Sequence, residues 1–190
     1  PLLRDRTALI GAVRLLAAAG MQVSALPLLD ADDNLQLGQP LHTADAQTRA
    51  LLAGTPPART LIHPALDGLS RHLQPIPSEV VIAAVVARLS SQPGRRAALY
   101  DWLLGNERAV FSSSASVDLL RSAPLFLTAQ GTPVSASDLS FEDDLPDLGI
   151  DWTPHPDIPR ALLALLRRQL DVGQLPPGVL LGRYLRPAYD

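Results

Sequence analysis

The chain has 190 residues, of which 47% are hydrophobic and 18% are charged, and its formal net charge is −3. This balance excludes a disordered chain and suits one domain or two small ones, because apolar residues are abundant enough to build a core. The sequence has no cysteine, which excludes disulfides, thiolate metal ligands and cysteine nucleophiles. All 16 basic residues are arginine, which also excludes a Walker-type lysine for ATP.

The longest apolar run covers residues 80–87. A transmembrane helix needs about 20 apolar residues, so we expect no membrane-spanning segment and no membrane partner. The sequence begins at Pro1 without a methionine, and we therefore expect a fragment of a longer protein.

The first half of the chain, residues 1–77, alternates helical and extended patterns. Helical spacing of Leu9, Val13 and Leu16 predicts a first helix over residues 5–19 that ends at Gly20. Two apolar runs, 25–29 and 35–37, flank the polar residues 30–34, which predicts a β-hairpin. Thr43 is the expected N-cap of a helix over residues 44–53 that ends at Gly54. Residues 59–62 are typical of a strand, and a short helix is expected from His63-Pro64 to residue 72.

The second half, residues 78–190, begins with the most apolar helix. Ser78 is the expected cap of this helix over residues 79–90, and Val81, Val85 and Leu89 are its predicted core residues, covered on more than one side. A helix over residues 94–104 follows. Ser116 is expected to cap a short helix that reaches residue 120.

A second hairpin is predicted over residues 123–134, and a last helix is expected from its cap, Asp157, to residue 170, with Gly173 beyond its end. The two hairpins match when Pro27 is aligned with Pro124, which places Asn34 on Gly131. Asn and Gly both tolerate positive φ, so this match has a physical reason.

His63-Pro64 and His155-Pro156 follow the two hairpins, which indicates an internal duplication. The halves are residues 1–77 and 78–190, or one compact domain of a longer chain. The predicted fold is α+β, with short antiparallel hairpins packed by about seven helices. We expect the two hairpins to superpose together with their His-Pro segments.

Metal sites are not expected. Asp30, Asp32 and Asn34 imitate the first ligands of an EF-hand loop, but Leu35 stands where the loop needs glycine and Leu41 where it needs glutamate. The histidines, at positions 42, 63, 72 and 155, lack zinc spacing. We interpret His63 and His155 as structural residues whose rings bond a neighbouring carbonyl.

No catalytic motif is present either. The serines at 112–114 and 116 have no nucleophile elbow, and the acidic residues 142–144 and 147 are neighbours in one loop rather than a spaced acid and base. We therefore expect no catalytic residues. A hydrolase whose active site is gathered from distant segments stays as an alternative.

The C-terminal part holds the only concentration of basic residues. From residue 160 onward there are five arginines and two aspartates, a balance of +3. These arginines could contact nucleic acid through phosphates, but the chain is poor in aromatic residues for base stacking. We treat them as a possible interaction surface for a protein, and a nucleic-acid-binding module stays as a second alternative. The residues concerned are Arg160, Arg167, Arg168, Arg183 and Arg186.

Three segments resemble the repeat regions of sacsin and related large bacterial proteins: residues 25–29 with their polar turn, residues 51–54 and residues 61–66. Residues 122–126, with Gly131 and Val134, resemble the hairpin of the same family. The resemblance covers most of residues 21–170. In that family such regions follow a GHKL-type ATPase fold, the class of the large heat-shock chaperones.

The resemblance implies a non-catalytic interaction or scaffold segment of a bacterial, cytoplasmic, multidomain chaperone-like ATPase. Its partner would be a protein or other domains of the same chain. The family's nucleotide-binding segment has no counterpart in these residues, so we expect neither ATPase activity nor a cofactor here.

Overall fold

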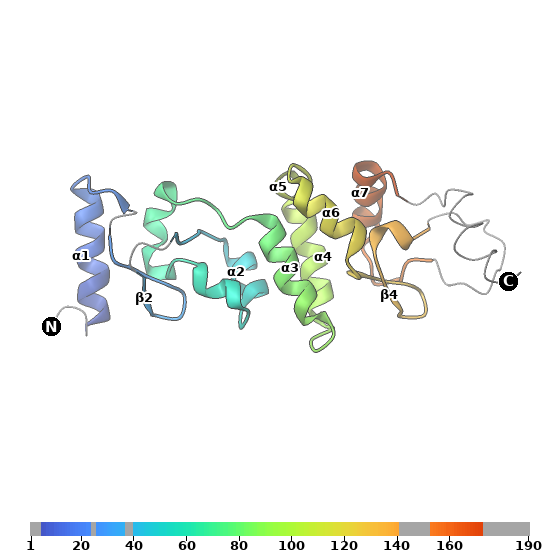
Figure 1. Cartoon of the computed structure of the whole chain (residues 1–190), viewed down its shortest axis with the longest axis horizontal. Helices are drawn as coiled ribbons and strands as arrows, with labels where there is room; N and C mark the ends of the chain where they lie inside the picture. Colours follow the sequence, from blue (N-terminus) through green and yellow to red (C-terminus); the bar gives the residue numbers. More distant parts are fainter. Residues whose placement is uncertain (1–4, 24–25, 37–39, 141–152, 173–190) are drawn as a thin grey trace, which may run out of the picture. The chain divides into compact units, whose positions relative to one another are not determined.

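The computed structural model describes residues 5–23, 26–36, 40–140 and 153–172. The chain divides into two compact units, Pro1–Val85 and Val86–Asp190. Both combine helices with one small antiparallel sheet, which confirms the predicted α+β class (Figure 1).

The first unit opens with helix α1, Arg6–Ala18, as predicted. Asp5 caps it, since its carboxylate accepts a hydrogen bond from the Ala8 amide, and Gly20 ends the turn with a φ of 88°. Strands β1, Leu28–Leu29, and β2, Leu35–Gln36, form the predicted hairpin. The remaining elements of this unit are α2 (Ala46–Leu52), the 3₁₀ segments η3 (Pro56–Thr60) and η4 (Pro64–His72), and the first turns of α3 (Ser78–Leu89).

Two local predictions for this unit are wrong. Asp45 rather than Thr43 caps α2, because its carboxylate accepts a hydrogen bond of 2.6 Å from the Thr48 amide. The first two residues of the expected strand over residues 59–62 are the end of η3, since the prolines at 56 and 57 favour a helical start. Only residues 61 and 62 form isolated bridges.

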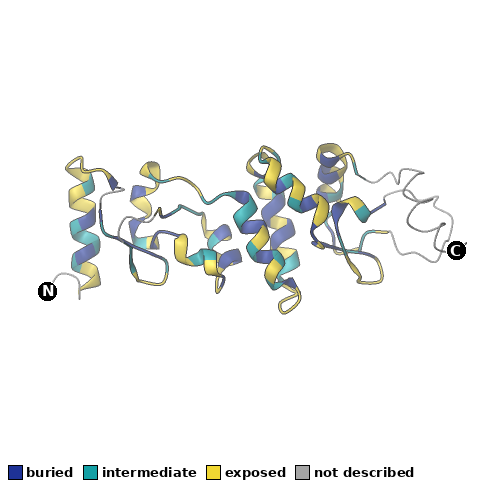
Figure 2. Cartoon of the chain, in the orientation of Figure 1, coloured by how far each residue is buried: buried dark blue, intermediate teal, exposed yellow. Residues whose placement is uncertain are grey.

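The first unit's core joins α1 to the hairpin and to η4. Leu9 and Val13 of α1 are buried in it, whereas Leu16, on the same predicted stripe, is 39% exposed. Figure 2 shows exposed and partly buried stretches along α1. The core is completed by side chains from the hairpin, its flanking segments and η4: Val23, Leu26, Leu28, Leu29, Leu41, Ile62, Leu66 and Leu69.

Helix α3 carries the predicted core residues. Val81, Val85 and Leu89 are all buried, which confirms them as core. Ala83 and Ala87 are exposed, so the apolar run 80–87 is not covered on every side. Small alanine side chains in this narrow stripe expose little apolar surface to water.

The second unit continues with α4 (Arg95–Gly105), α5 (Glu107–Phe111), α6 (Ser114–Ser122), β3 (Phe126–Leu127), β4 (Pro133–Val134), η5 (Ala136–Asp138) and α7 (Arg160–Leu170). Helix α5 was not predicted. The cap of α6 is Ser113 rather than Ser116, whose amide donates to the Ser113 hydroxyl.

The N-cap of helix α7 lies two residues later than predicted. Pro159, not Asp157, is its N-cap, and Asp171 ends it in a left-handed conformation with a φ of 53°. Gly173 lies outside the described residues. The apolar stripe of α7 is buried and consists of Leu162, Leu165, Leu166 and Leu170. Beside the second hairpin, Tyr100 of α4 stacks on Phe126 with ring centroids 5.9 Å apart, so the hairpin is tied to the helices through an aromatic pair.

The two hairpins share one hydrogen-bond pattern. Leu28 pairs with Gln36 in the first, and Phe126 pairs with Val134 in the second. At the turn, the amide of Asp30 donates to Asn34 O and the amide of Thr128 donates to Thr132 O, both at 3.0 Å. Each of these positions in the first hairpin lies 98 residues before its counterpart in the second. This confirms that the two hairpins are equivalent, as predicted.

The register of the sequence alignment is nevertheless wrong by one residue. It placed Asn34 on Gly131, an offset of 97, whereas the positive φ of Gly131 (82°) is matched by Asp33 (66°). Asp tolerates the left-handed region almost as well as Asn. With polar residues at 32, 33 and 34, the composition of the turn did not reveal which of them adopts it.

Candidate functional site

Each hairpin is joined to the segment that follows it by a histidine. The His63 amide donates to Leu29 O at 2.8 Å, and the His155 amide donates to Leu127 O at 2.9 Å. The Nδ1 atom of each ring accepts a hydrogen bond from the backbone two residues on, from Ala65 at 3.0 Å and from Asp157 at 3.2 Å. The predicted structural role is thus supported, but the rings accept from an amide instead of bonding a carbonyl.

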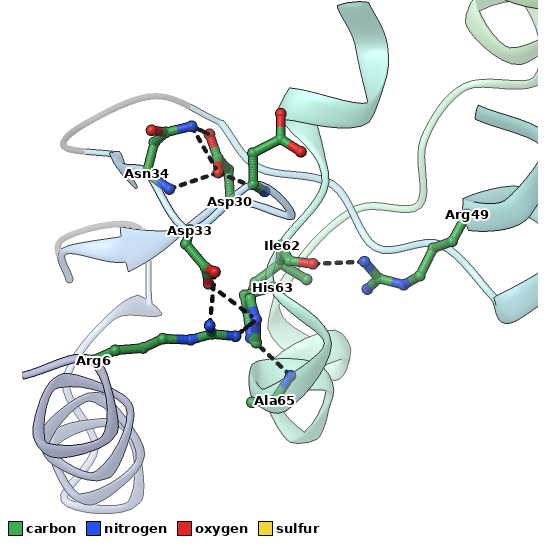
Figure 3. A network of polar contacts seen from close by, with 9 residues as sticks. Arg6, Asp30, Asp33, Asn34, Arg49, Ile62, His63 and Ala65 are labelled. Carbon is green, nitrogen blue, oxygen red and sulfur yellow. Dashed lines mark hydrogen bonds and ion pairs between the residues drawn. The ribbon is translucent and has the colours of Figure 1, made fainter. Parts of the chain in front are cut away.

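In the first unit, the His63 ring belongs to a polar triad with Arg6 and Asp33 (Figure 3). Asp33 Oδ2 lies 2.7 Å from Arg6 Nη1, and Asp33 Oδ1 lies 3.2 Å from His63 Nε2. Arg6 Nη2 is 2.5 Å from the same ring nitrogen. The His63 side chain is only 10% exposed, whereas the other two side chains are about half exposed (53% and 43%). The triad therefore ties α1, the hairpin turn and η4 together.

The triad's geometry does not suit general base catalysis. The Ala65 amide donates to Nδ1, and Nε2 lies between Asp33 Oδ1 and Arg6 Nη2. A histidine base needs one ring nitrogen directed at the substrate, and here both nitrogens have protein partners. The second unit has Gly131 where the first has Asp33, so the same triad cannot form around His155.

Asp30, beneath the same turn, is a fully buried carboxylate. It accepts hydrogen bonds from the amides of Asp32 and Asn34, both at 2.9 Å, and from Gln36 Nε2 at 2.8 Å. Burial acts to raise the pKa of Asp30, but these hydrogen bonds outweigh it and hold the pKa below the ordinary value of 3.8. The carboxylate thus organises the hairpin turn. Among the described residues, no cluster of three or more His, Asp or Glu is placed to hold a metal ion.

A groove opens between α1 and η4, which pack against each other. Its volume is about 290 Å³. Its apolar lining comes from Leu66 and Leu69 of η4 and from the alanines at 17 and 18 of α1. Arg14 of α1 and Arg71 of η4 also line the groove, and Gly68 leaves part of the wall without a side chain.

Apolar side chains are also exposed at the C-terminal end of α1 and just beyond it. Leu15 of α1 is 73% exposed, and Met21, three residues after the helix, is 46% exposed. Leu15 and Ala18 are neighbours on the helix surface because they are three residues apart. Among the described residues, the only large exposed hydrophobic side chains are Leu15, Leu16 and Met21. We call the groove together with Leu15 the α1–η4 surface.

The basic residues predicted as an interaction surface are only partly brought together. Arg160, Arg167 and Arg168 lie exposed on α7, and Arg168 pairs with Glu107 of α5 at 2.6 Å. Arg183 and Arg186 lie outside the described residues. The Glu107 carboxylate reduces the local positive charge, so α7 does not present an unopposed basic face.

The acidic loop residues 142–144 and 147 also lie outside the described part of the chain. The α1–η4 surface was missed from the sequence because its residues are about 50 positions apart. One signal was present: the run Leu15–Ala19 surrounds the helix with apolar residues, more than a single buried stripe can use.

Comparisons with protein-family models, curated proteins and solved structures found no match to this chain. Within the described residues, no helix is long and apolar enough to cross a membrane.

Proposed function

We propose that this chain is a non-catalytic protein-interaction segment and that its binding surface is the α1–η4 surface of the first unit. The observation that carries the proposal is the clustering of exposed apolar residues there. Scattered exposed apolar side chains are ordinary in water-soluble folds. Here they fall within residues 15–21, beside an apolar groove, and such continuous patches mark binding sites.

The chemistry of the histidines supports a non-catalytic role, since both ring nitrogens of His63 are engaged within the fold. The resemblance to sacsin-like regions further supports a place in a cytoplasmic chaperone-like ATPase, in which this segment would link the ATPase domain to a client or partner protein. The ion pair between Arg168 and Glu107 favours a protein over a nucleic acid as that partner.

A site-specific photocrosslinker tests the proposal in cells that make the full-length protein. We expect a benzoylphenylalanine at Leu15 to crosslink one defined protein, or another domain of the parent chain, and the same residue at the exposed Asp118 of α6 not to do so. Equal capture from both positions, or none from Leu15, would contradict the proposal. A salt-dependent gel shift with RNA or DNA that is lost in Arg167→Glu would favour the nucleic-acid alternative instead.

A further inference from the structure

The α1–η4 groove combines an apolar floor with two cations. Leu66 is 1% exposed and Leu69 is 7% exposed, so the floor is part of the packed core and is fixed in place. Arg14 is anchored because Nη2 donates a hydrogen bond to Ala65 O. Arg71 Nε lies 2.9 Å from His72 Nε2. Each guanidinium has five N–H donors, so these single contacts leave most of its donors for a ligand.

The charge around the groove is positive although the chain carries a net charge of −3. Helix α1 has no acidic residue, and the carboxylate of η4, Asp67, is paired with Arg49 at 2.6 Å. No acidic side chain lines the groove among the described residues. A ligand that matches this surface carries a negative charge next to an apolar group.

The size of the groove favours a peptide over a small molecule as its ligand. About 290 Å³ lies at the lower limit of the roughly 300–1,000 Å³ typical of small-molecule sites, which suits one apolar side chain. The apolar surface also continues outward to Leu15, where a second side chain of an extended ligand would pack. These features fit a peptide better than a compact ligand.

Resting on the proposed function, we infer that the α1–η4 surface binds a peptide segment in which a large apolar side chain stands next to a carboxylate. The apolar side chain fills the groove over Leu66 and Leu69. The carboxylate lies between Arg14 and Arg71, where guanidinium groups bind carboxylates with two hydrogen bonds.

Gly68 offers a precise way to block the groove. A Cβ at this position meets no atom within 4 Å, and its φ is not positive. The fold therefore has room for a side chain at position 68, and because Gly68 lines the groove we expect the indole of Gly68→Trp to obstruct it. Gly94→Trp is the matched control, because Gly94 has the same open surroundings and lies in the second unit.

The experiment selects a display library of random peptides against the full chain and measures the affinity of the recovered peptides by fluorescence anisotropy. We expect Leu or Phe next to Asp or Glu among them. We also expect about tenfold weaker binding, equivalent to ~1.4 kcal/mol, in Gly68→Trp and in Arg71→Glu. Gly94→Trp and Arg59→Glu, at a 74% exposed arginine side chain of the same unit, should bind as the wild type does.

The inference is overturned if no peptide is enriched, if the enriched peptides lack carboxylates, or if Gly68→Trp leaves binding unchanged. Binding of laurate in the groove without peptide binding would also overturn it, because laurate carries the same two groups on a lipid. If Leu15 still crosslinks a defined protein whose binding Gly68→Trp does not weaken, the proposed function stands and only the groove assignment fails.

Discussion

Replacing Asp30 should test how the first hairpin is held. Its carboxylate accepts hydrogen bonds from two turn amides and from the side chains of Asn34 and Gln36. A hydrogen bond to a charged group contributes about 1.5–3 kcal/mol. The turn residues 32–34 are exposed, so water replaces part of this loss. We therefore expect Asp30→Ala to lower the free energy of unfolding by about 2–4 kcal/mol, a large share of the ~5–15 kcal/mol typical of a domain.

Two further substitutions make the test specific. In the second hairpin the equivalent residue is Thr128, whose hydroxyl accepts a hydrogen bond from the Thr132 amide at 3.1 Å, so Asp30→Thr should recover part of the loss. Asp32→Ala is the control. Its side chain is 52% exposed and its contact with Arg59 is 3.4 Å long, and such surface pairs contribute at most about 1 kcal/mol.

The pH dependence gives the same prediction a second readout. Because the pKa of Asp30 is lower in the folded chain than its ordinary value of 3.8, the ionised carboxylate stabilises the fold above that pH. This contribution disappears as the pH falls through the lowered pKa. Urea unfolding followed by far-ultraviolet circular dichroism should show the difference between wild type and Asp30→Asn shrink below pH 3.8. The reasoning is refuted if Asp32→Ala lowers the free energy of unfolding as much as Asp30→Ala does.

Three other predictions follow from buried or constrained residues. Val81→Asp should abolish the cooperative thermal transition, because an unpaired buried carboxylate costs several kcal/mol, whereas Ala83→Asp, on the exposed stripe of α3, should leave it within about 0.5 kcal/mol. Burial raises the pKa of Tyr100 to about 12, so absorbance titration should show a late ionisation that Tyr100→Phe removes. The associated stability is present below pH 10 and is lost as the pH rises toward 12. Gly131→Ala should lower the free energy of unfolding by about 1–2 kcal/mol, because the φ of 82° at this position is strained for alanine. A thermal melt unchanged by this substitution would contradict the prediction.

The sequence predicted the elements that depend on local patterns. The helical spacing before Gly20 and the polar residues 30–34 between two apolar runs are local signals, and α1 and the first hairpin formed where these signals placed them. Competing local signals explain the errors. Thr43 and Asp45 are both good caps, and the carboxylate of Asp45 reaches the Thr48 amide. Prolines at 56 and 57 start a 3₁₀ segment where β-propensity alone favours a strand.

The candidate site was beyond local patterns because its parts are distant in sequence. Arg14 and Arg71 become neighbours only after α1 packs on η4, and that packing depends on the buried Leu9 and Val13. The histidine pair could be predicted as equivalent, since each His-Pro step repeats. The triad around His63 could not, because it requires Asp33 at the turn position that Gly131 occupies in the second unit.

The comparison of the two units also bears on the proposed docking surface. Their hairpins share a hydrogen-bond pattern, so the fold alone does not distinguish them. The first unit differs in that Arg6, Asp33 and His63 fix α1 against the hairpin and η4 through polar contacts. Together with the buried Leu9 and Val13, these contacts hold α1, so Leu15 and Leu16 near its C-terminal end need not be buried to secure the helix. An exposed apolar end on such a helix is what the proposed docking surface needs, and within the described residues the second unit, with Gly131 at the turn, has no such triad.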